Sequence, residues 1–310
     1  MHGWIILDKP VGLGSTQAVS AVKRALRQGG YGKFKVGHGG TLDPLASGVL
    51  PIAVGEATKL AGRLLDSDKI YDFTIRFGEQ TDTLDTEGVV IATSDVRPTA
   101  AAIEAILPRF TGPIDQIPPA YSALKVHGER AYDRARAGEE VVLASRAVTI
   151  HSLHSSPTVR DGPPSGAGEE LVEATLTAHV SKGTYIRSLA RDIAAALGTV
   201  GHVTMLRRIK AGPFTLDSAI SLDKLGKAGM ARELEYLLLP LRAGLDDIPA
   251  LSLDPDQAGA LRQGRILAGY ATDDGLQFAL LGETPVALVE VRDGNVQVVR
   301  GFNLMSKDNA

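Results

Sequence analysis

The stretch KVGHGGTLDPLASGVLPIAVGEA, residues 35–57, constrains the fold more than any other part of the chain. Its three glycines between positions 37 and 40 allow the backbone to take positive φ or to approach a ligand closely. Pro44 fixes its own φ and disfavours a helical conformation at Asp43. The apolar residues between 45 and 54 predict a short turn that leads into a buried strand. The pattern therefore predicts a carboxylate on a stiff loop with apolar packing behind it.

Two interpretations of Asp43 follow from the residues alone. A nucleophile or general base needs a carboxylate held on a rigid support, as this loop would hold it. An Asp in a turn also commonly accepts a hydrogen bond from its own backbone, and would then have no catalytic role. The spacing does not separate these two interpretations.

Composition and charge exclude several classes of protein. The chain has 310 residues, 44% hydrophobic content, a net charge of −3 and no Cys, which excludes disulfides and thiolate metal sites. No apolar run of about 18 residues is present, so we expect no membrane span. The first residues lead into a strand pattern without the features of a signal peptide, and a cytoplasmic location is expected.

The charge is unevenly distributed along the chain. Residues 1–40 hold six Lys or Arg against one acid, and residues 181–212 again hold six against one. Two basic regions in a chain whose net charge is negative are typical of a protein that binds a polyanion with one face. Solvated helix faces are the alternative explanation.

Hydrophobic periodicity predicts the main elements. Residues 3–9 read as a buried strand, and residues 17–27 as a helix capped by Ser15 and Thr16. Residues 70–77, IYDFTIRF, alternate as a half-buried strand. Residues 186–197 read as a helix with one apolar face, and three short strands are expected between residues 277 and 299.

Four ordered blocks of sequence carry a family resemblance. They are GHGGTLDPLASGVLPIAVGEATK, DKIYDFTIRFGEQTDTLDTEG, IPPAYSALKVHGERAYDRARAG and VSKGTYIRSLARDIAAALG. Together they resemble the bacterial tRNA pseudouridine-55 synthases, the TruB family, closely over residues 2–243 and more loosely to residue 310.

The resemblance implies a fold and a domain organisation. It implies an α+β pseudouridine-synthase fold, with a mixed, largely antiparallel central sheet flanked by helices. Residues 1–243 would form the catalytic domain, with a thumb-like RNA-binding insertion at about 117–147. Residues 244–310 would form a small β-rich domain similar to a PUA domain. Independently of the resemblance, the Pro-, Gly- and Ser-rich composition of residues 155–168 predicts a disordered surface loop.

The resemblance also assigns catalytic roles. Asp43 falls on the catalytic Asp of the family, where it would act at C1′ of a uridine, either as a nucleophile or as a base. Arg187 would lie beside it in a bidentate contact. Tyr71 would stack on the target base and take part in moving the C5 proton. The uridine would be flipped out of its stack, and His38 would wedge into the vacated space.

Other residues are expected to contact the RNA. Leu206 would pack beneath the base, and the basic residues would contact phosphates. The remaining predicted contacts are Lys9, Gly39, Gly40, Lys125, Arg207 and Arg208.

The expected partner is the T-stem-loop of tRNA, bound by a monomer that needs no obligatory protein partner and no cofactor. No metal is expected, because Asp82 and Asp85 lack a His or Glu at ligand spacing. A noncatalytic RNA-binding or RNA-chaperone protein is an alternative. A glycosidase is the least favoured alternative, because Asp43 has no second acid in a matching motif.

Overall fold

The computed structural model describes residues 1–304 except 123, 127, 140 and 157–168. Its centre is a ten-stranded sheet in which all neighbouring strands are antiparallel except β3 and β12, which are parallel. The strands of the main path, in spatial order, are β14 (Leu239–Pro240), β1 (Gly3–Lys9), β3 (Ser47–Val54), β12 (Gly201–Ala211), β4 (Lys69–Phe77), β11 (Glu173–Val180), β10 (Arg146–Ser155) and β7 (Gly112–Gln116). Two short strands extend this path: β2 (Val36–His38) pairs with β3, and β13 (Phe214–Thr215) pairs with β12. The expected mixed, largely antiparallel sheet is therefore confirmed.

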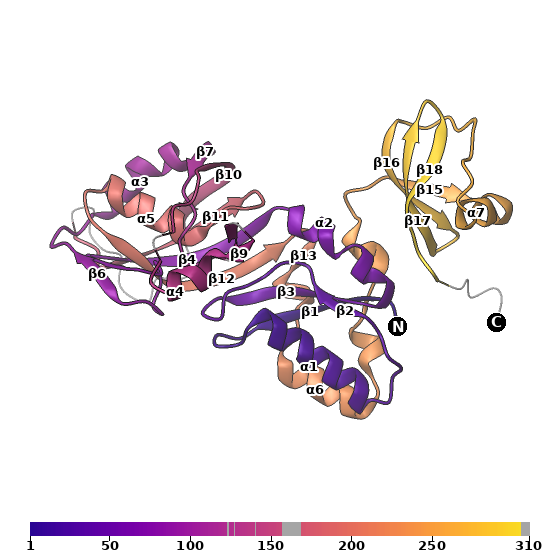
Figure 1. The fold of residues 1–310 in the computed structure, drawn as a ribbon, viewed down its shortest axis with the longest axis horizontal. Coiled ribbons are helices and arrows are strands. Elements are labelled where there is room, and N and C mark those ends of the chain that lie inside the picture. The colour runs from indigo at the N-terminus through magenta and orange to yellow at the C-terminus, as the bar shows by residue number, and fades with distance from the viewer. Residues whose placement is uncertain (123, 127, 140, 157–168, 305–310) are drawn as a thin grey trace.

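Helices cover the sheet in two groups (Figure 1). The helices α1 (Ser15–Gln28) and α6 (Leu222–Ala231) lie side by side at one end, whereas α3 (Ala100–Ile106) and α5 (Ile186–Ala196) lie at the other. The remaining α-helices are α2 (Ala61–Asp66), α4 (Ala131–Arg136) and α7 (Pro255–Arg262). Short 3₁₀ helices span Gly55–Lys59, Leu107–Phe110, Leu216–Ser218, Leu234–Leu237 and Leu241–Gly244.

Periodic apolar residues explain why these helices pack where they do. In α1 the buried residues Ala18, Val22, Ala25 and Leu26 recur at helical spacing and form one face. Gly229 of α6 lies against Ala25, where a β-carbon would come within 3.0 Å of it. A small residue at this crossing lets the two helices approach closely.

Strand β4 shows the predicted alternation. Phe73, Ile75 and Phe77 are buried in the main core, and Arg76 between the last two is exposed. Since successive side chains of a strand point to opposite faces, one face of β4 packs under α5 while the other carries polar residues.

The start of α1 differs from the expectation. Ser15 and Thr16 were expected to cap the helix, but Ser15 is already its first residue and Gly14 is the N-cap. The side chain of Gln17 accepts a hydrogen bond from the Gly14 backbone N–H at 2.8 Å. The hydroxyl of Ser15 is therefore free to bond elsewhere.

The C-terminal part forms its own sheet, at the upper right of Figure 1. Its strands, in spatial order, are β15 (Ala250–Leu253), β16 (Gly275–Leu281), β17 (Thr284–Arg292) and β18 (Asn295–Gly301). The three predicted strands are found, but residues 250–253, expected to be loop, add a parallel edge strand to β16. Phe278, Leu288 and Phe302 share a core cluster with Trp4 and Leu241. The module is thus packed onto the first strand of the central sheet.

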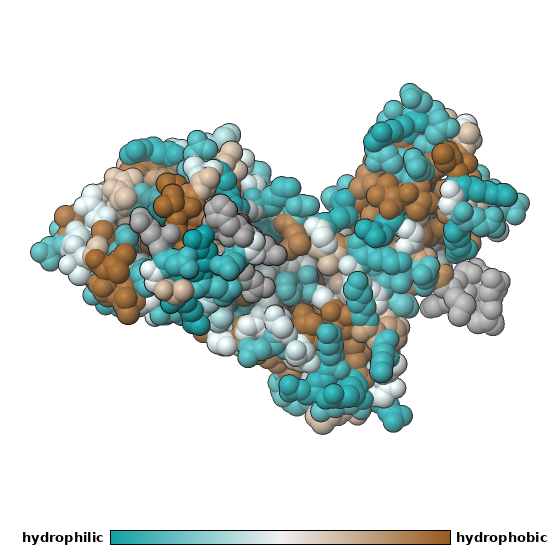
Figure 2. All heavy atoms as spheres, viewed as in Figure 1, coloured by the Kyte–Doolittle hydropathy of each residue, from teal (hydrophilic) through white to brown (hydrophobic). Residues whose placement is uncertain are grey.

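Two hairpins stand outside the sheets. One pairs β5 (Glu79–Thr81) with β6 (Val90–Thr93), and the other pairs β8 (Lys125–Val126) with β9 (Glu129–Arg130). Val89, Val90 and Ile91 are exposed, and Figure 2 shows a brown apolar patch at the end of the molecule where Figure 1 places β6. Among the described residues, no helix has both the length and the apolar character that crossing a bilayer requires.

Candidate active site

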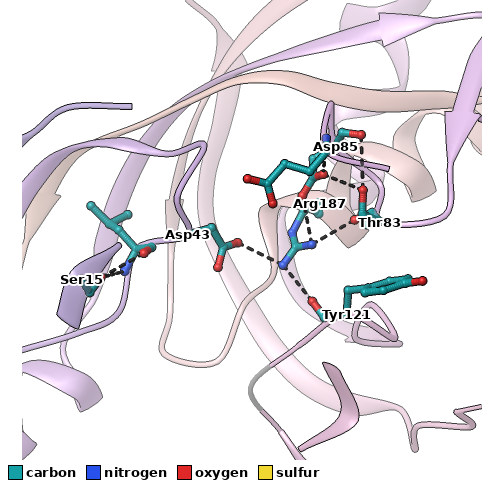
Figure 3. A network of polar contacts seen from close by, with 8 residues as sticks. Ser15, Asp43, Thr83, Asp85, Tyr121 and Arg187 are labelled. Carbon is teal, nitrogen blue, oxygen red and sulfur yellow. Dashed lines mark hydrogen bonds and ion pairs between the residues drawn. The ribbon is translucent and has the colours of Figure 1, made fainter. Parts of the chain in front are cut away.

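A cavity of about 750 Å³ lies between the Asp43 loop, the start of α5 and the segment after β7. It is lined by three residues that are far apart in the sequence, Asp43, Tyr71 and Arg187. Leu206 and Gly40 line it as well. The structure therefore brings together most of the residues expected at a catalytic centre, and Figure 3 shows how Asp43 and Arg187 face each other.

The backbone around Asp43 is held by hydrogen bonds from α1 and from the turn between β1 and α1. The hydroxyl of Ser15 donates to the carbonyl of Leu42 at 2.9 Å and accepts from its N–H at 2.8 Å (Figure 3). On the other side of Asp43, the carbonyl of Pro44 accepts from the Gly12 N–H at 2.8 Å. Residues before and after the carboxylate are thus held by hydrogen bonds, which restricts its position.

Arg208 supports the same loop from beneath. Its side chain is buried, with the residue 1% exposed, and donates to the carbonyls of Val49, Thr41 and Gly40 at 2.8, 3.2 and 3.3 Å. Gly48, at φ +101°, allows this packing, because a β-carbon there would lie 2.2 Å from the Arg208 carbonyl oxygen. Arg208 therefore positions the loop that carries Asp43.

Lys9 is a second buried cation of this support. It is 0% exposed, and its Nζ donates to the carbonyls of Pro10, Leu13 and Pro44 at 3.0, 2.6 and 3.3 Å. Burial lowers the pKa of Lys9 from 10.5 to about 8, and the charge of Asp43 partly opposes this shift. In this structure the donors of Lys9 and Arg208 are used by loop carbonyls, so both side chains support the Asp43 loop, and their phosphate contacts stay a prediction.

Arg187 bridges two carboxylates. Its NH2 lies 3.0 Å from Oδ2 of Asp43, and its NH1 lies 3.1 Å from Oδ2 of Asp85. NH1 also donates to the Thr83 carbonyl at 2.9 Å and NH2 to the Tyr121 carbonyl at 3.0 Å (Figure 3). Arg187 thus lies beside Asp43 and shares its guanidinium with a second acid, and the bidentate contact with Asp43 stays a prediction.

The two acids differ in their surroundings. The side chain of Asp85 is 2% exposed, and its Oδ1 accepts from Thr83 Oγ1 at 2.6 Å and from the Glu87 N–H at 3.0 Å. The side chain of Asp43 is 42% exposed and faces the cavity. The oxygens of Asp85 are therefore used by contacts within the protein, whereas the oxygens of Asp43 are accessible to a ligand.

Leu84 turns the chain so that this network can form. It is buried and adopts φ +62°, an uncommon conformation for a residue with a branched side chain. Its carbonyl accepts from the Val203 N–H at 3.0 Å, which fixes the loop to β12. The turn presents the Thr83 carbonyl and the Asp85 carboxylate to the same guanidinium.

Sequence reasoning missed the roles of Ser15, Asp85 and Tyr121. Asp85 was considered only as a metal ligand, and Ser15 only as a helix cap. The sequence signal for Asp85 was its position in the polar loop that follows the predicted strand at residues 70–77. That loop lies at the same end of the sheet as Asp43. No sequence signal indicates the Tyr121 contact, because it is made by a backbone carbonyl.

Tyr71 and Leu206 form the apolar wall of the cavity. Tyr71 is half-buried on β4, and Leu206 is buried on β12. Lys69 precedes Tyr71 by two residues on the same face and also lines the cavity, and burial lowers its pKa to about 8. A flat aromatic side chain and an aliphatic one on neighbouring strands could hold a planar ring between them.

The segment after β7 is anchored to α5 at several points. Ser188 donates to the Ile117 carbonyl at 2.8 Å, and the side-chain oxygen of Gln116 accepts from the Tyr185 N–H at 2.8 Å. The hydroxyl of Tyr121 donates to Oδ2 of Asp82 at 3.0 Å. The base of the predicted thumb is thus tied to the helix that carries Arg187.

The other expected RNA contacts lie outside the cavity. His38 ends β2 opposite Ile52, and burial lowers the pKa of its imidazole, with the charge of Arg208 adding to this effect. Arg207 forms a two-pronged ion pair with Asp8, at 2.9 and 3.0 Å, and remains partly exposed. Gly39 lies against Leu64, where a β-carbon would come within 2.6 Å.

Two predictions concern parts of the chain that the structure does not describe. Lys125 belongs to β8, but its side chain lies outside the described residues. The predicted surface loop at 155–168 falls mostly on residues 157–168, which also lie outside them.

Comparisons with known proteins identify the family of the chain. Residues 23–186 match the family model described as the N-terminal domain of the TruB family pseudouridylate synthases. Residues 187–246 match the model of the tRNA pseudouridylate synthase B C-terminal domain.

Curated relatives match nearly the whole chain. A protein named tRNA pseudouridine synthase B from Novosphingobium aromaticivorans is 67% identical over 98% of this chain and 98% of its own length. A protein of the same name from Zymomonas mobilis is 59% identical over 98% of this chain and 96% of its own length.

Solved structures share the fold. One chain in a crystal structure of a Cbf5-Nop10-Gar1 complex superposes with a TM-score of 0.72 and 26% identity, covering 99% of this chain and 86% of that chain. A chain from an H/ACA RNP bound to a substrate RNA containing 2′-deoxyuridine gives a TM-score of 0.70 and 24% identity, over 99% and 86% of the two chains.

Proposed function

We propose that this chain, which belongs to the TruB family of pseudouridylate synthases, isomerises a uridine of tRNA to pseudouridine, and that the target is uridine 55 of the T-loop. The names of the 67% and 59% identical relatives support tRNA as the substrate. The resemblance of the Asp43 loop to the pseudouridine-55 synthases supports the position of the target.

A single observation carries the proposal. The Asp43 carboxylate is 42% exposed at the wall of the cavity, and Arg187 holds it at 3.0 Å. Backbone hydrogen bonds fix the residues on both sides of it, and Leu206 and Tyr71 face the same space. This is the setting that an acid needs if it is to act on a sugar whose base lies in an apolar slot.

The uridine must leave its stack before it can enter. Flipping a base costs a few kcal/mol, which contacts in the pocket offset. The cavity of about 750 Å³ is within the usual range of ligand pockets, roughly 300–1,000 Å³. Tyr71 would stack on the uracil, as aromatic side chains do with unpaired bases in RNA-binding proteins.

The reaction breaks the N1–C1′ bond and forms a C5–C1′ bond after the uracil turns. The C5 proton is lost and N1 gains a proton, so the net change is an isomerisation that needs no redox partner or group donor. Asp43 either attacks C1′ as a nucleophile or removes a ribose proton as a base. The Tyr71 hydroxyl would assist removal of the C5 proton.

Arg187 would orient Asp43. Its guanidinium lies 3.0 Å from Oδ2 of the carboxylate, which restricts the position of the acid. The buried Asp85 offsets part of the positive charge of the Arg187 guanidinium and fixes its position. Arg187 can therefore orient Asp43 without fully balancing the negative charge of the Asp43 carboxylate.

Binding of the tRNA would use surfaces on both sides of the cavity. Residues 117–147 would act as a thumb over the stem-loop, since their base is tied to α5. The C-terminal module would act as a PUA-like domain that contacts the rest of the tRNA. We propose that the chain works without an obligatory protein partner.

The test uses the purified chain alone with an unmodified tRNA transcript labelled with tritium at C5 of its uridines. The proposal predicts tritium release close to one equivalent per tRNA, and none above background from a transcript carrying cytidine at position 55. Equal release from both transcripts would contradict the choice of uridine 55. No release from either one, with tRNA still bound, would favour the noncatalytic RNA-binding alternative.

A further inference from the structure

A cluster of two imidazoles and one carboxylate lies outside the cavity, on two neighbouring strands of the central sheet and directly before a third. Asp68 directly precedes β4, His179 lies on β11 and His151 on β10. Oδ2 of Asp68 is 3.2 Å from Nε2 of His151 and 3.7 Å from Nε2 of His179. None of the three lines the cavity at Asp43, and the proposed reaction does not use them.

A β-bulge directs His151 into this cluster. Ile150 pairs with Val180 and Ser152 pairs with His179, so β10 has one extra residue, His151, at this point. Ile150 and Val180 are both buried on the core face of the sheet. The extra residue lets His151 and Ser152 share the opposite face with His179, where a bulge commonly re-aims a side chain.

Strand alternation places the carboxylate on the same face. His179 pairs with Ile70, so the two side chains lie on one side of the sheet. Asp68 precedes Ile70 by two residues and therefore has the same orientation. Strands β10 and β11 and the residue before β4 thus each bring one donor atom to the cluster.

We propose that Asp68, His151 and His179 bind a divalent transition metal ion, with Zn²⁺ as the best fit. Their three donor atoms lie within 4.8 Å of one another. A tetrahedral Zn²⁺ with bonds of about 2.0–2.1 Å places its ligand atoms about 3.3 Å apart. The two contacts of Asp68, at 3.2 and 3.7 Å, are already close to that spacing.

The donor set suits this ion. Imidazole and carboxylate are common Zn²⁺ ligands, and the side chains are partly exposed, which leaves a fourth position for water. The bound ion would link β4, β11 and β10, so it would stabilise the folded sheet.

The experiment measures metal binding to the full chain, prepared without a polyhistidine tag and treated with a chelator. Because the chain has no Cys, His and carboxylate side chains are the main candidates for binding. Co²⁺ is titrated while its visible absorption is recorded, and the melting temperature is measured with and without Zn²⁺. The variants are His179→Ala and Asp68→Asn, and the matched control is His154→Ala, an exposed imidazole on the same β10 strand.

The proposal predicts one Co²⁺ per wild-type chain and a melting temperature that rises with Zn²⁺. Each of the two cluster variants should lose at least about 100-fold in Co²⁺ affinity and lose the Zn²⁺ stabilisation, while His154→Ala should match the wild type. Wild-type affinity no greater than that of His179→Ala would overturn the proposal. An equal loss in His154→Ala would also overturn it, because binding would then reflect scattered surface histidines.

Discussion

Replacing Asp85 with Asn removes one charge from the Arg187 network without changing the size of the side chain. The Asp85 oxygens accept three hydrogen bonds, from Arg187 NH1 at 3.1 Å, Thr83 Oγ1 at 2.6 Å and the Glu87 N–H at 3.0 Å. An amide has one oxygen, so its NH₂ group must face either the Arg187 guanidinium or the Glu87 N–H. At least one hydrogen bond thus becomes a contact between two donors.

The magnitude follows from the burial of the pair. The side chains of Arg187 and Asp85 are 8% and 2% exposed, and removing one partner of a buried ion pair costs about 3–5 kcal/mol. Arg187 keeps Asp43 and the carbonyls of Thr83 and Tyr121 as partners, which compensates part of this loss. We expect the free energy of unfolding to fall by about 3 kcal/mol.

Urea unfolding followed by circular dichroism measures this difference. The matched control is Asp82→Asn in the same loop, because Asp82 accepts hydrogen bonds from Tyr121 and the Val89 N–H but has no ion pair within the described residues. The control should lose at most about 1 kcal/mol. A loss in Asp85→Asn no larger than in Asp82→Asn would refute the claim that the buried charge holds Arg187.

Three further predictions concern the loop, the buried lysine and the aromatic wall. Ser15→Ala removes both hydrogen bonds between Ser15 and the Leu42 backbone, so turnover in the tritium assay should fall about 10-fold while tRNA affinity stays unchanged. The control Ser20→Ala loses only an exposed hydrogen bond within α1 and should match the wild type. Because burial lowers the pKa of Lys9 from 10.5 to about 8, the unfolded chain binds more protons than the folded chain between these values, so Lys9 makes the free energy of unfolding rise with pH over this range. In urea unfolding experiments at pH 8 and pH 10.5, Lys9→Met should remove up to about 3 kcal/mol of this rise in the free energy of unfolding. An unchanged rise in the variant would contradict the lowered pKa of Lys9. Tyr71→Phe keeps the ring but lacks the hydroxyl, so it should keep tRNA affinity and lose most turnover. Turnover equal to that of the wild type would contradict a role of the hydroxyl in proton removal and leave only stacking on the base.

The sequence predicted elements whose signals are local. The alternation of residues 70–77 and the helical spacing of residues 186–197 gave β4 and α5 almost to their ends. The Asp43 loop was also predictable, since Pro44 and the neighbouring glycines restrict its backbone. Such patterns fix local geometry because each residue is constrained by its neighbours along the chain.

Contacts between distant residues were harder to predict. The Arg187–Asp85 pair joins residues 102 positions apart, so it depends on how β4 and α5 pack. The adjacent Arg207 and Arg208 were expected to act alike, yet strand alternation points them to opposite faces. Arg207 pairs with Asp8 and stays partly exposed, whereas Arg208 is buried beneath the loop. Once the strand was recognised, its period of two could have separated them.

The central claim, that Asp43 performs the chemistry, is tested most directly by Asp43→Asn. Asn keeps the size of the side chain, and the bonds of Ser15 to Leu42 and of Gly12 to Pro44 keep the loop in place. Tritium release from C5-labelled tRNA is measured at saturating enzyme, next to the tRNA affinity of both proteins. We predict an affinity close to that of the wild type and no detectable tritium release. Release by Asp43→Asn at a rate near that of the wild type would contradict the account.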